Sequence, residues 1–442
     1  MGLFDARVPR YTSYPTAPHF TSAVGGVQMA DWIRAIAPGS AISLYLHVPF
    51  CRRLCWFCAC RTQGTRSDEP VRAYVETLKA EIALLARHLP EGVTLSRMHW
   101  GGGTPTLLEP RLIWELAQAV GRILPMGRGG EFSVEIDPGE IDDARLDALA
   151  AAGMSRASVG VQDFDPVVQK AIGRDQSYEL THAAVQMIRA RGIGSVNADI
   201  LYGLPHQSVE RQADTVQKLL SLAPDRVALY GYAHVPWMAR RQTMIDAGNL
   251  PDPFARMELF EVAQALFLAD GFARIGIDHF ARPGDGLAQA SVNGTLRRNF
   301  QGYTDDRSDV LIALGASGIS RFPQGYAQNA GATSDHVKAV REGLFSTRRG
   351  HVFTGDDRLR SRMIEALMCG FAIDRAGIAA EFNPPEGLMD GLFARVADAF
   401  PGMVTLDQDG LTILPQGRAL TRMMAQKLDA YAAPAMAHSS AV

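Results

Sequence analysis

The sequence has few cysteines, no long apolar run and no excess of charge of either sign. Only 5 of its 442 residues are cysteine, and a small odd number excludes a secreted disulfide framework. No apolar stretch approaches the roughly 20 residues that cross a bilayer. Residues 1–7 lack the basic start and apolar run of a secretory signal. We therefore expect a cytoplasmic protein with no membrane partner.

The charge balance excludes a further class of partner. The formal net charge is −3, and lysine and arginine form no block. Proteins that bind nucleic acids usually present a basic patch, so no nucleic-acid partner is expected. Hydrophobic residues make up 47% of the chain, which allows a large core and excludes global disorder. The length fits an α/β barrel with a smaller second domain.

Strand-like and helix-like segments alternate along the first 270 residues. The pair recurs at least six times, which predicts an α/β fold with a parallel sheet, closed or partly closed into a barrel. The periodicity predicts strands over 42–48, 93–100, 131–137, 157–162, 195–201 and 226–232. It predicts helices over 69–88, 110–124, 142–151, 209–222 and 254–269, with helical segments up to residue 191.

The two ends of the chain differ from this pattern. Prolines and tyrosines interrupt any regular element in residues 1–40, which we expect to form an ordered, irregular N-terminal arm. The barrel domain is expected over 41–342. Residues 343–442 predict a small, mainly helical domain, with helices over 358–371 and from 417 towards 431. A short β-hairpin over 403–414 turns at Asp409-Gly410.

Four of the cysteines lie within ten residues. Cys51, Cys55 and Cys58 have the spacing Cys-x3-Cys-x2-Cys, which lets three thiolates converge from one loop. Thiolates hold cuboidal [4Fe–4S] clusters, and three ligands would leave one iron open to bind a substrate. A structural zinc site would usually need a second pair of ligands, and a ferredoxin has a different spacing. We expect Cys60 not to be a ligand, and Cys369 to be a small core residue.

Other candidate residues fall at the ends of the predicted strands, where barrels of this kind bind ligands. A glycine-rich segment, Trp100 to Thr106, follows the second strand, and its glycines let the backbone approach a ligand closely. Glu135, Gln162, Asp199 and Ala233 lie at or near the ends of later strands.

The cysteine spacing after the first strand, followed by the glycine segment, resembles the radical S-adenosylmethionine (SAM) superfamily. More specifically, the chain resembles the oxygen-independent coproporphyrinogen III oxidase (coproporphyrinogen dehydrogenase) family over nearly its whole length. The similar segments are 10–16, 45–51, 160–164, 202–205, 278–283 and 298–304, together with the additional Cys60. The resemblance implies a radical SAM partial (β/α) barrel with an N-terminal arm and a small helical C-terminal domain.

The resemblance also implies the cofactors and their sites. Cys51, Cys55 and Cys58 would ligate one [4Fe–4S] cluster, and two SAM molecules would bind beside it. No side chain is assigned a catalytic role. The residues implied for the SAM sites are Tyr45, Phe57, Gly102, Gly103, Thr104, Glu135, Gln162, Arg174, Asp199, Ala233 and Ile319.

The implied reaction is the anaerobic oxidative decarboxylation of two propionates of coproporphyrinogen III to vinyl groups, giving protoporphyrinogen IX. A 5′-deoxyadenosyl radical would remove hydrogen from each propionate, the cofactor supplying the chemistry and the protein the orientation. The expected partners are coproporphyrinogen III and a one-electron donor such as flavodoxin or ferredoxin, with the chain a monomer. The alternatives are a heme-binding chaperone or a heme-modifying enzyme on the same fold; the 11–16 segment and Cys60 argue against the chaperone.

Several residues have both a functional and a structural interpretation. Arg10, His279, Arg282 and Arg298 are candidates for holding the propionates, since arginine binds carboxylates in a bidentate manner, or they form structural ion pairs. Tyr11 and Tyr14 either contact the macrocycle or pack the arm down. Glu135 either contacts SAM or pairs with Arg174, Asp199 either contacts SAM or caps a helix, and His47 is expected to be structural.

Overall fold

One curved sheet forms the centre of the computed structural model, which describes residues 2–3 and 6–431. Within these residues the sheet has 12 strands in the order β16-β15-β14-β13-β1-β4-β5-β6-β7-β8-β10-β9. The strands from β13 to β8 in this order run parallel. Their bounds are β1 Ala41–Val48, β4 Thr94–Gly102, β5 Met126–Ile136, β6 Arg156–Gln162, β7 Ser195–Tyr202, β8 Arg226–Gly231 and β13 Leu311–Leu314.

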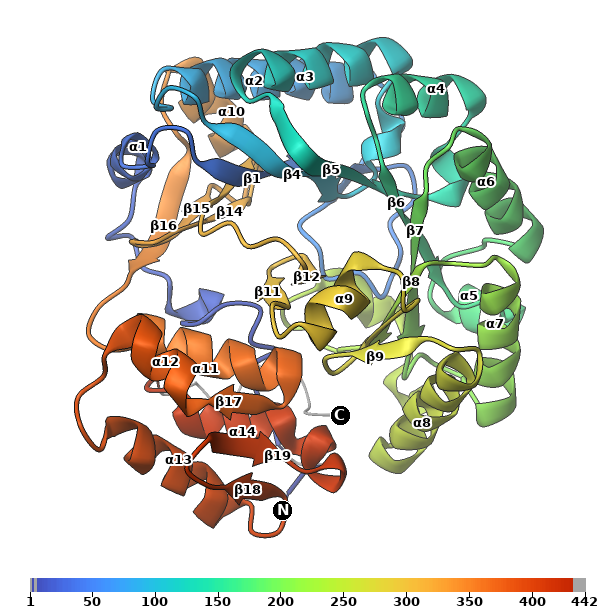
Figure 1. Ribbon diagram of the computed structural model, residues 1–442. Helices are drawn as coiled ribbons and strands as arrows, with labels where there is room; N and C mark the ends of the chain where they lie inside the picture. The colour runs from blue at the N-terminus through green and yellow to red at the C-terminus, as the bar shows by residue number, and fades with distance from the viewer. Residues whose placement is uncertain (1, 4–5, 432–442) are drawn as a thin grey trace.

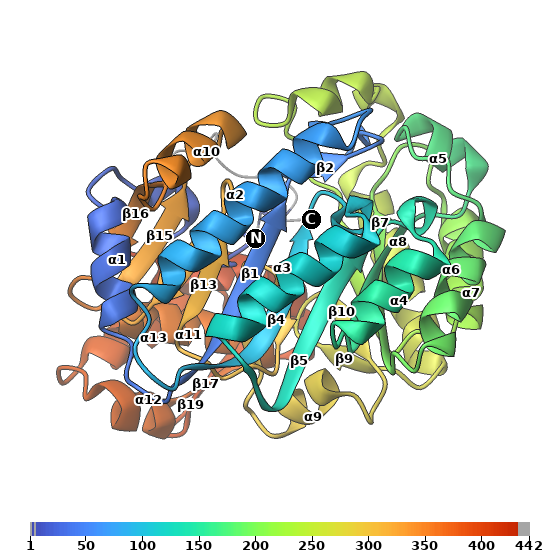
Figure 2. The ribbon, with the colours of Figure 1, turned by 90° about the horizontal axis from the view of Figure 1, so that it is seen from above.

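Helices cover the outer face of this sheet (Figure 1), and Figure 2 shows α2 and α3 lying over β1, β4 and β5. The helices cover the sheet because each has an apolar face: α3 buries Leu112, Ile113 and Leu116 on one face while Trp114 on another face stays exposed.

No helix within the described residues is long and apolar enough to cross a bilayer. The helices of this part are α2 Glu69–Ala86, α3 Pro110–Ile123, α4 Asp143–Ala151, α5 Pro166–Ala171, α6 Tyr178–Ala190, α7 Val209–Ser221, α8 Pro253–Ala269, α9 Gly286–Val292 and α10 Thr333–Arg341.

The six predicted strand–helix units are all present, but the sequence analysis missed the strands that extend both edges of the sheet. On one edge these are β10 His279–Ala281 and β9 Ala273–Ile275, both antiparallel. On the other they are β13, which pairs with β1, followed by β14 Ile319–Phe322, β15 Gly325–Asn329 and β16 Thr347–Val352. Because β16 belongs to the main sheet, sheet membership would place a domain boundary after Val352 rather than at residue 342. The division into domains stays a proposal.

The C-terminal elements pack around a second hydrophobic cluster and occupy the gap between β16 and β9 (Figure 1). The predicted hairpin is present, and the second predicted helix begins as a 3-10 turn, Pro415–Leu420, before α14. The bounds are α11 Asp357–Gly370, β17 Ala372–Asp374, α12 Arg375–Phe382, α13 Leu388–Ala399, β18 Val404–Leu406, β19 Gly410–Ile413 and α14 Thr421–Leu428.

The N-terminal arm is ordered where it is described, and it contains a helix that the sequence analysis missed, α1 Gly26–Arg34. The arm is fixed to the C-terminal elements by two buried tyrosines. The Tyr11 hydroxyl donates to Asp429 Oδ2 at 3.0 Å, and the Tyr14 hydroxyl accepts from the Ala430 backbone N–H at 2.9 Å. Both rings belong to the second hydrophobic cluster. The sequence left open whether Tyr11 and Tyr14 contact the macrocycle or pack the arm down, and these contacts support packing of the arm.

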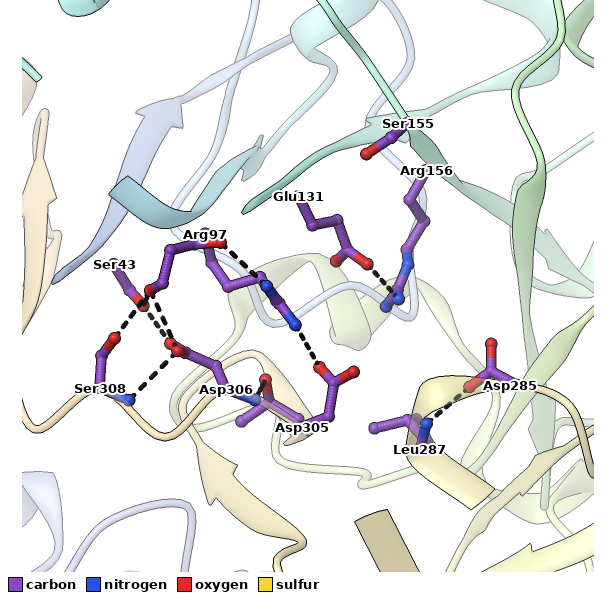
Figure 3. Close-up of polar contacts among 12 residues, drawn as sticks. Ser43, Arg97, Glu131, Ser155, Arg156, Asp285, Leu287, Asp305, Asp306 and Ser308 are labelled. Atoms are coloured by element: carbon purple, nitrogen blue, oxygen red, sulfur yellow. Dashed lines mark hydrogen bonds and ion pairs between the residues drawn. The ribbon is translucent and has the colours of Figure 1, made fainter. Parts of the chain in front are cut away.

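Charged side chains fill the end of the barrel at which the parallel strands begin (Figure 3). Arg97 on β4 pairs with Asp305 at 2.9 Å, and Arg156 on β6 pairs with Glu131 on β5. The neighbouring Asp306 accepts from Ser43 on β1. Buried arginines and carboxylates are stable only when paired in this way. These contacts hold the 305–308 segment across one end of the barrel.

A buried carboxyl between α2 and α10 gives the fold a testable pH dependence. Glu81 accepts from the Gly315 backbone N–H at 2.8 Å and lies 3.5 Å from His336 Nε2. Burial raises the pKa of Glu81 from 4.5 to about 8, and burial also lowers the pKa of His336 to about 4. The folded protein therefore keeps Glu81 protonated at pH values where the unfolded chain ionises it.

We predict that Glu81→Gln flattens part of the pH profile of stability. With the folded-state pKa raised, the wild type loses stability as the pH rises from the unfolded value towards 8. The variant has no such proton, so its unfolding free energy relative to wild type should rise by on the order of 3 kcal/mol between about pH 5 and 8.5. Urea unfolding at both pH values measures this, and parallel profiles would contradict the proposed protonation of Glu81.

Candidate functional site

The cysteine loop leaves the end of β1 and is fixed at several points. Its first residues form β2, Phe50–Cys51, which pairs with β3, Gln63–Gly64. The Trp56 backbone N–H donates to the Ile172 carbonyl at 3.0 Å, and Arg241 donates to the Thr62 carbonyl at 2.7 Å. The loop is therefore held on both sides by segments that follow β6 and β8.

The donor set of this loop fits an iron–sulfur cluster. Cys51, Cys55, Cys58 and Cys60 are all free thiols, and Arg174 Nη1 donates to Cys55 Sγ at 3.3 Å, as it could to a thiolate ligand. A hydrogen bond from Cys60 lowers the pKa of Cys58 to about 6. Within the described residues, no three His, Cys, Asp or Glu side chains meet at one point that could hold a single ion. In a cubane each cysteine binds a different iron, so no such meeting point is needed.

The glycine segment at the end of β4 packs directly against the cysteine loop and its neighbours. A Cβ on Gly101 would lie 2.5 Å from Glu135 Oε1, and one on Gly102 would lie 2.4 Å from the His47 ring. A Cβ on Gly103 would lie 2.5 Å from the Phe50 carbonyl oxygen. Gly102 also has a φ of 112°, which favours glycine. These positions exclude side chains, so the backbone itself forms this wall of the site.

We predict that Gly103→Ala impairs the site without unfolding the barrel. Its Cβ would collide with the Phe50 backbone, so the cysteine loop must move away from the glycine segment. Cleavage of SAM should fall at least about tenfold, given the precision that bound reactants require. The control is Gly121→Ala on α3, where a new Cβ meets no atom within 4 Å. Equal cleavage rates in both variants would show that the contact is unimportant.

Glu135 lies at the centre of the polar residues that face the cysteine loop. Its carboxylate accepts from the Gly102 backbone N–H at 2.9 Å and contacts His99 Nε2 at 3.2 Å. Burial opposes ionisation, but these hydrogen bonds hold the pKa of Glu135 below its usual value. The partners of Glu135 are therefore Gly102 and His99, and not Arg174, with which the sequence suggested a structural pair. Ionised Glu135 can accept a hydrogen bond from a cationic or polar ligand.

Arg174 and Asp199 are also held by local partners. Arg174 donates to the Gly160 carbonyl at 2.8 Å and lies 3.5 Å from Asp137. Asp199 on β7 accepts from Asn197 at 2.8 Å and from Ser158 at 3.0 Å, and burial raises its pKa. These contacts are with strand side chains, so the suggestion that Asp199 caps a helix is wrong. Both residues face the same end of the barrel as Glu135.

The remaining predicted residues surround this group from several elements. Tyr45 stacks on His99 with ring centroids 5.7 Å apart and bonds to His47 Nδ1 at 3.1 Å. His47 also contacts the Arg61 carbonyl at 3.1 Å, in agreement with a structural role. Thr104 is buried. Gln162 ends β6 with a φ of 70°, and Ile319 begins β14. That these residues bind SAM stays a proposal.

One residue that the sequence analysis missed connects the cysteine loop to the end of β8. Gln242 is buried, and its side-chain amide donates to the Phe57 carbonyl at 2.8 Å and to the Ala233 carbonyl at 3.0 Å. Phe57 and Ala233 are therefore joined through one side chain. No motif surrounds Gln242, so the sequence carried no signal for this role.

A cavity of about 630 Å³ opens beside Ala233, between the end of β8, the arm and the C-terminal elements. Of its lining residues that the structure describes, seven are arginines from distant parts of the chain: Arg7, Arg10, Arg256, Arg274, Arg298, Arg418 and Arg422. Burial, followed by neighbouring arginines, lowers the pKa of Arg422 to about 10. Such crowding of like charges is unfavourable unless an anionic ligand offsets it.

Three of these arginines have an Nε donor without a partner among the described residues. The Nε atoms of Arg256, Arg298 and Arg418 are buried without a hydrogen-bond partner among the described residues. Buried donors of this kind are normally satisfied by protein, water or ligand. The volume of the cavity and its seven lining arginines fit a large ligand with several negative groups.

The four residues predicted to hold propionates are divided by the structure. Arg10 and Arg298 line the cavity. His279 instead faces the barrel interior, where it lines a separate cavity of about 230 Å³. Arg282 pairs with Asp270 at 2.6 Å and stacks over Phe272 outside the arginine cavity. The interpretation of Arg282 as a substrate contact is therefore wrong, and its structural interpretation is confirmed. Cys369 is a buried core residue, as expected.

Residues 45–219 match the family model of the radical SAM superfamily. The curved parallel sheet, the cysteine loop at the end of its first strand and the glycine segment after its second are the features of such an enzyme. The fold and the site thus define a radical SAM enzyme.

The relatives narrow this class further. The chain is 64% identical over 442 residues to the oxygen-independent coproporphyrinogen III oxidase of Paracoccus denitrificans, covering 100% of this chain and 98% of the relative. It is 37% identical to the enzyme of that name from Escherichia coli, covering 96% and 93% of the two chains. The solved structure of coproporphyrinogen III oxidase from Escherichia coli, described as a radical SAM enzyme, matches with a TM-score of 0.90 and 35% identity, over 97% of this chain and 100% of that one.

The chain belongs to the oxygen-independent coproporphyrinogen III oxidase family. This confirms the predicted fold class and the prediction of an oxidoreductase. Membership implies a [4Fe–4S] cluster and SAM as cofactors, whereas the number of SAM molecules stays a prediction. The two alternatives, a heme chaperone and a heme-modifying enzyme, are not favoured by these relatives.

Proposed function

We propose that this protein converts two propionates of coproporphyrinogen III to vinyl groups, releasing carbon dioxide and giving protoporphyrinogen IX without oxygen. The observation that carries the proposal is the arginine cavity at the end of β8. Coproporphyrinogen III has four carboxylates around its rim, and arginine is suited to bind carboxylates through two parallel hydrogen bonds. The cavity supplies seven arginines from five parts of the chain: the arm, α8, β9, the 297–299 strand and the C-terminal segment 415–428.

The position of the cavity at the end of β8 supports this proposal. Gly231, Tyr232 and Ala233 at the end of β8 line it, and Gln242 links Ala233 to Phe57 in the cysteine loop. A substrate held by the arginines would thus present one edge to the SAM site. Binding by remote carboxylates can position the reacting group at little further entropic cost.

When bound, the cluster and SAM would supply a 5′-deoxyadenosyl radical for removal of a hydrogen atom from the propionate β-carbon. The chain's own residues orient and enclose the reaction. Cys51, Cys55 and Cys58 would hold the cluster, and Glu135 would accept a hydrogen bond from SAM. The arm, fixed by Tyr11 and Tyr14, would keep water from the substrate.

After the loss of that hydrogen atom, each propionate would lose carbon dioxide and one electron to become a vinyl group, so two propionates would pass two electrons to a one-electron acceptor. We propose two SAM molecules, one for each propionate. A small one-electron donor such as flavodoxin or ferredoxin would reduce the cluster, and the chain would act as a monomer.

The proposal is tested with reconstituted protein under strictly anaerobic conditions. Coproporphyrinogen III, SAM and a reductant should give protoporphyrinogen IX, with carbon dioxide and 5′-deoxyadenosine formed in equal amounts. Heme in place of coproporphyrinogen should give no product. Tight binding of heme, together with no release of carbon dioxide from coproporphyrinogen III, would overturn the proposal in favour of a chaperone.

A further inference from the structure

One carboxylate stands among the arginines of the large cavity. Asp278 lies in the turn between β9 and β10 and lines the cavity with its side chain 19% exposed. The Asp278 Oδ1 atom lies at hydrogen-bonding distance from His279 Nδ1, 2.8 Å away. The other carboxylate among the described lining residues, Glu261 on α8, is exposed. Asp278 is therefore the acidic group that a ligand would meet inside the cavity.

Asp278 stays ionised at every pH at which the protein would work. Burial alone would raise its pKa, but His279, Arg298 and Arg10 hold that pKa down at about 2. A permanent negative charge weakens the attraction of the cavity for carboxylates. Its presence in a site for a tetracarboxylate therefore needs an explanation beyond the binding of the propionates.

The proposed substrate offers a second kind of polar group. A porphyrinogen has four pyrrole N–H donors at its centre, and its saturated bridging carbons let the ring pucker so that these donors point to one face. Buried N–H groups must find acceptors, because leaving a donor unpaired costs about 1–3 kcal/mol. A carboxylate is the strongest acceptor that a side chain can provide.

We infer that Asp278 binds the central N–H groups of the substrate while the surrounding arginines bind its rim carboxylates. This inference rests on the proposed function and goes beyond it, because it names the residue that selects the oxidation state of the macrocycle. A porphyrinogen presents its N–H groups to Asp278. A metalloporphyrin such as heme has none, and it brings only carboxylates to a site that already contains the negative charge of Asp278.

The inference and a purely electrostatic role of Asp278 predict opposite changes in the affinity of Asp278→Asn for coproporphyrinogen III. If Asp278 only offsets arginine charge, Asp278→Asn makes the cavity more positive and tightens the binding of every tetracarboxylate. If it accepts N–H groups, the variant loses the negative charge and one of the two acceptor oxygens, which an NH2 donor replaces. Binding of coproporphyrinogen III should then weaken at least about tenfold.

The experiment measures two ligands on the whole cluster-loaded protein under anaerobic conditions. Coproporphyrinogen III and copper(II) coproporphyrin III carry the same four carboxylates. Coproporphyrinogen III also has central N–H groups, whereas the copper complex has no N–H group. Calorimetry should show weaker coproporphyrinogen binding by Asp278→Asn, with copper coproporphyrin binding unchanged or tighter. The matched control is Glu261→Gln, which removes a carboxylate at the exposed edge of the cavity and should not change the ratio of the two affinities.

Other outcomes separate the inference from the proposed function. Equal shifts of both ligands in Asp278→Asn would overturn the inference and leave the proposed function standing. Failure of the wild type to bind either ligand would overturn the proposed function itself. If the variant does not fold, ¹⁵N-labelled coproporphyrinogen III on the wild type decides the matter. Its N–H protons should move downfield on binding, and unshifted signals would overturn the inference.

Discussion

Replacing Cys51 with alanine is expected to remove the [4Fe–4S] cluster and all cleavage of SAM. Cys51 lies in β2, next to the glycine segment, and we propose it as one of only three ligands. A cubane with two protein ligands is poorly held, and metal sites lose their affinity when a ligand is removed. Anaerobic iron and sulfide analysis, the visible absorbance and 5′-deoxyadenosine formation measure the effect.

Cys369→Ala is the control for this experiment. Cys369 is buried in a separate hydrophobic cluster beside Tyr303 and Leu296, so its loss should leave iron content and SAM cleavage unchanged. Full retention of iron by Cys51→Ala would remove Cys51 from the ligand set. Loss of iron from both variants would indicate general instability instead.

Replacing Arg298 with methionine is expected to lower kcat/KM for decarboxylation by about 100-fold, since a lost charged hydrogen bond in a buried site costs several kcal/mol. Arg298 lines the large cavity, donates to the Tyr303 hydroxyl at 3.2 Å and has an unpartnered Nε. Methionine keeps the apolar volume and removes the donors. SAM cleavage without substrate should be spared, because Arg298 is not among the residues around Glu135.

The chain offers a matched control in Arg282→Met. Arg282 was a candidate for the same role, but it pairs with Asp270 outside the cavity. Steady-state rates of carbon dioxide release should therefore be near wild type for Arg282→Met. A similar loss in both variants, or an unchanged rate in Arg298→Met, would contradict the assignment of the cavity to the substrate.

The parts of this protein that could be predicted from its sequence are those with a local signal. The cysteine site is contiguous, because its ligands lie within eight residues of one loop, Cys51 to Cys58. The six strand–helix units have a clear period in apolar residues. The edge strands β9, β10 and β13 to β16 have 3 to 6 residues each, too few for a period to stand out.

The substrate side of the site could not be predicted, because folding alone assembles it. Arg10 comes from the arm, Arg256 from α8 and Arg422 from α14, and each is isolated among unrelated residues in the sequence. Neighbours in sequence can also be misleading. Asp278, His279 and Arg282 belong to one segment, but Asp278 faces the arginine cavity, His279 faces the barrel interior and Arg282 pairs at the surface.

The most direct test of the account is the paramagnetic resonance spectrum of the reduced protein with SAM labelled with ¹⁵N in its amino group. If three cysteines hold a cubane and leave one iron open, the labelled nitrogen should couple magnetically to the cluster. The coupling should be absent when unlabelled SAM replaces the labelled SAM, and absent in Cys51→Ala. A cluster that binds SAM nearby without any such coupling, or a protein that contains zinc in place of iron, would contradict the account.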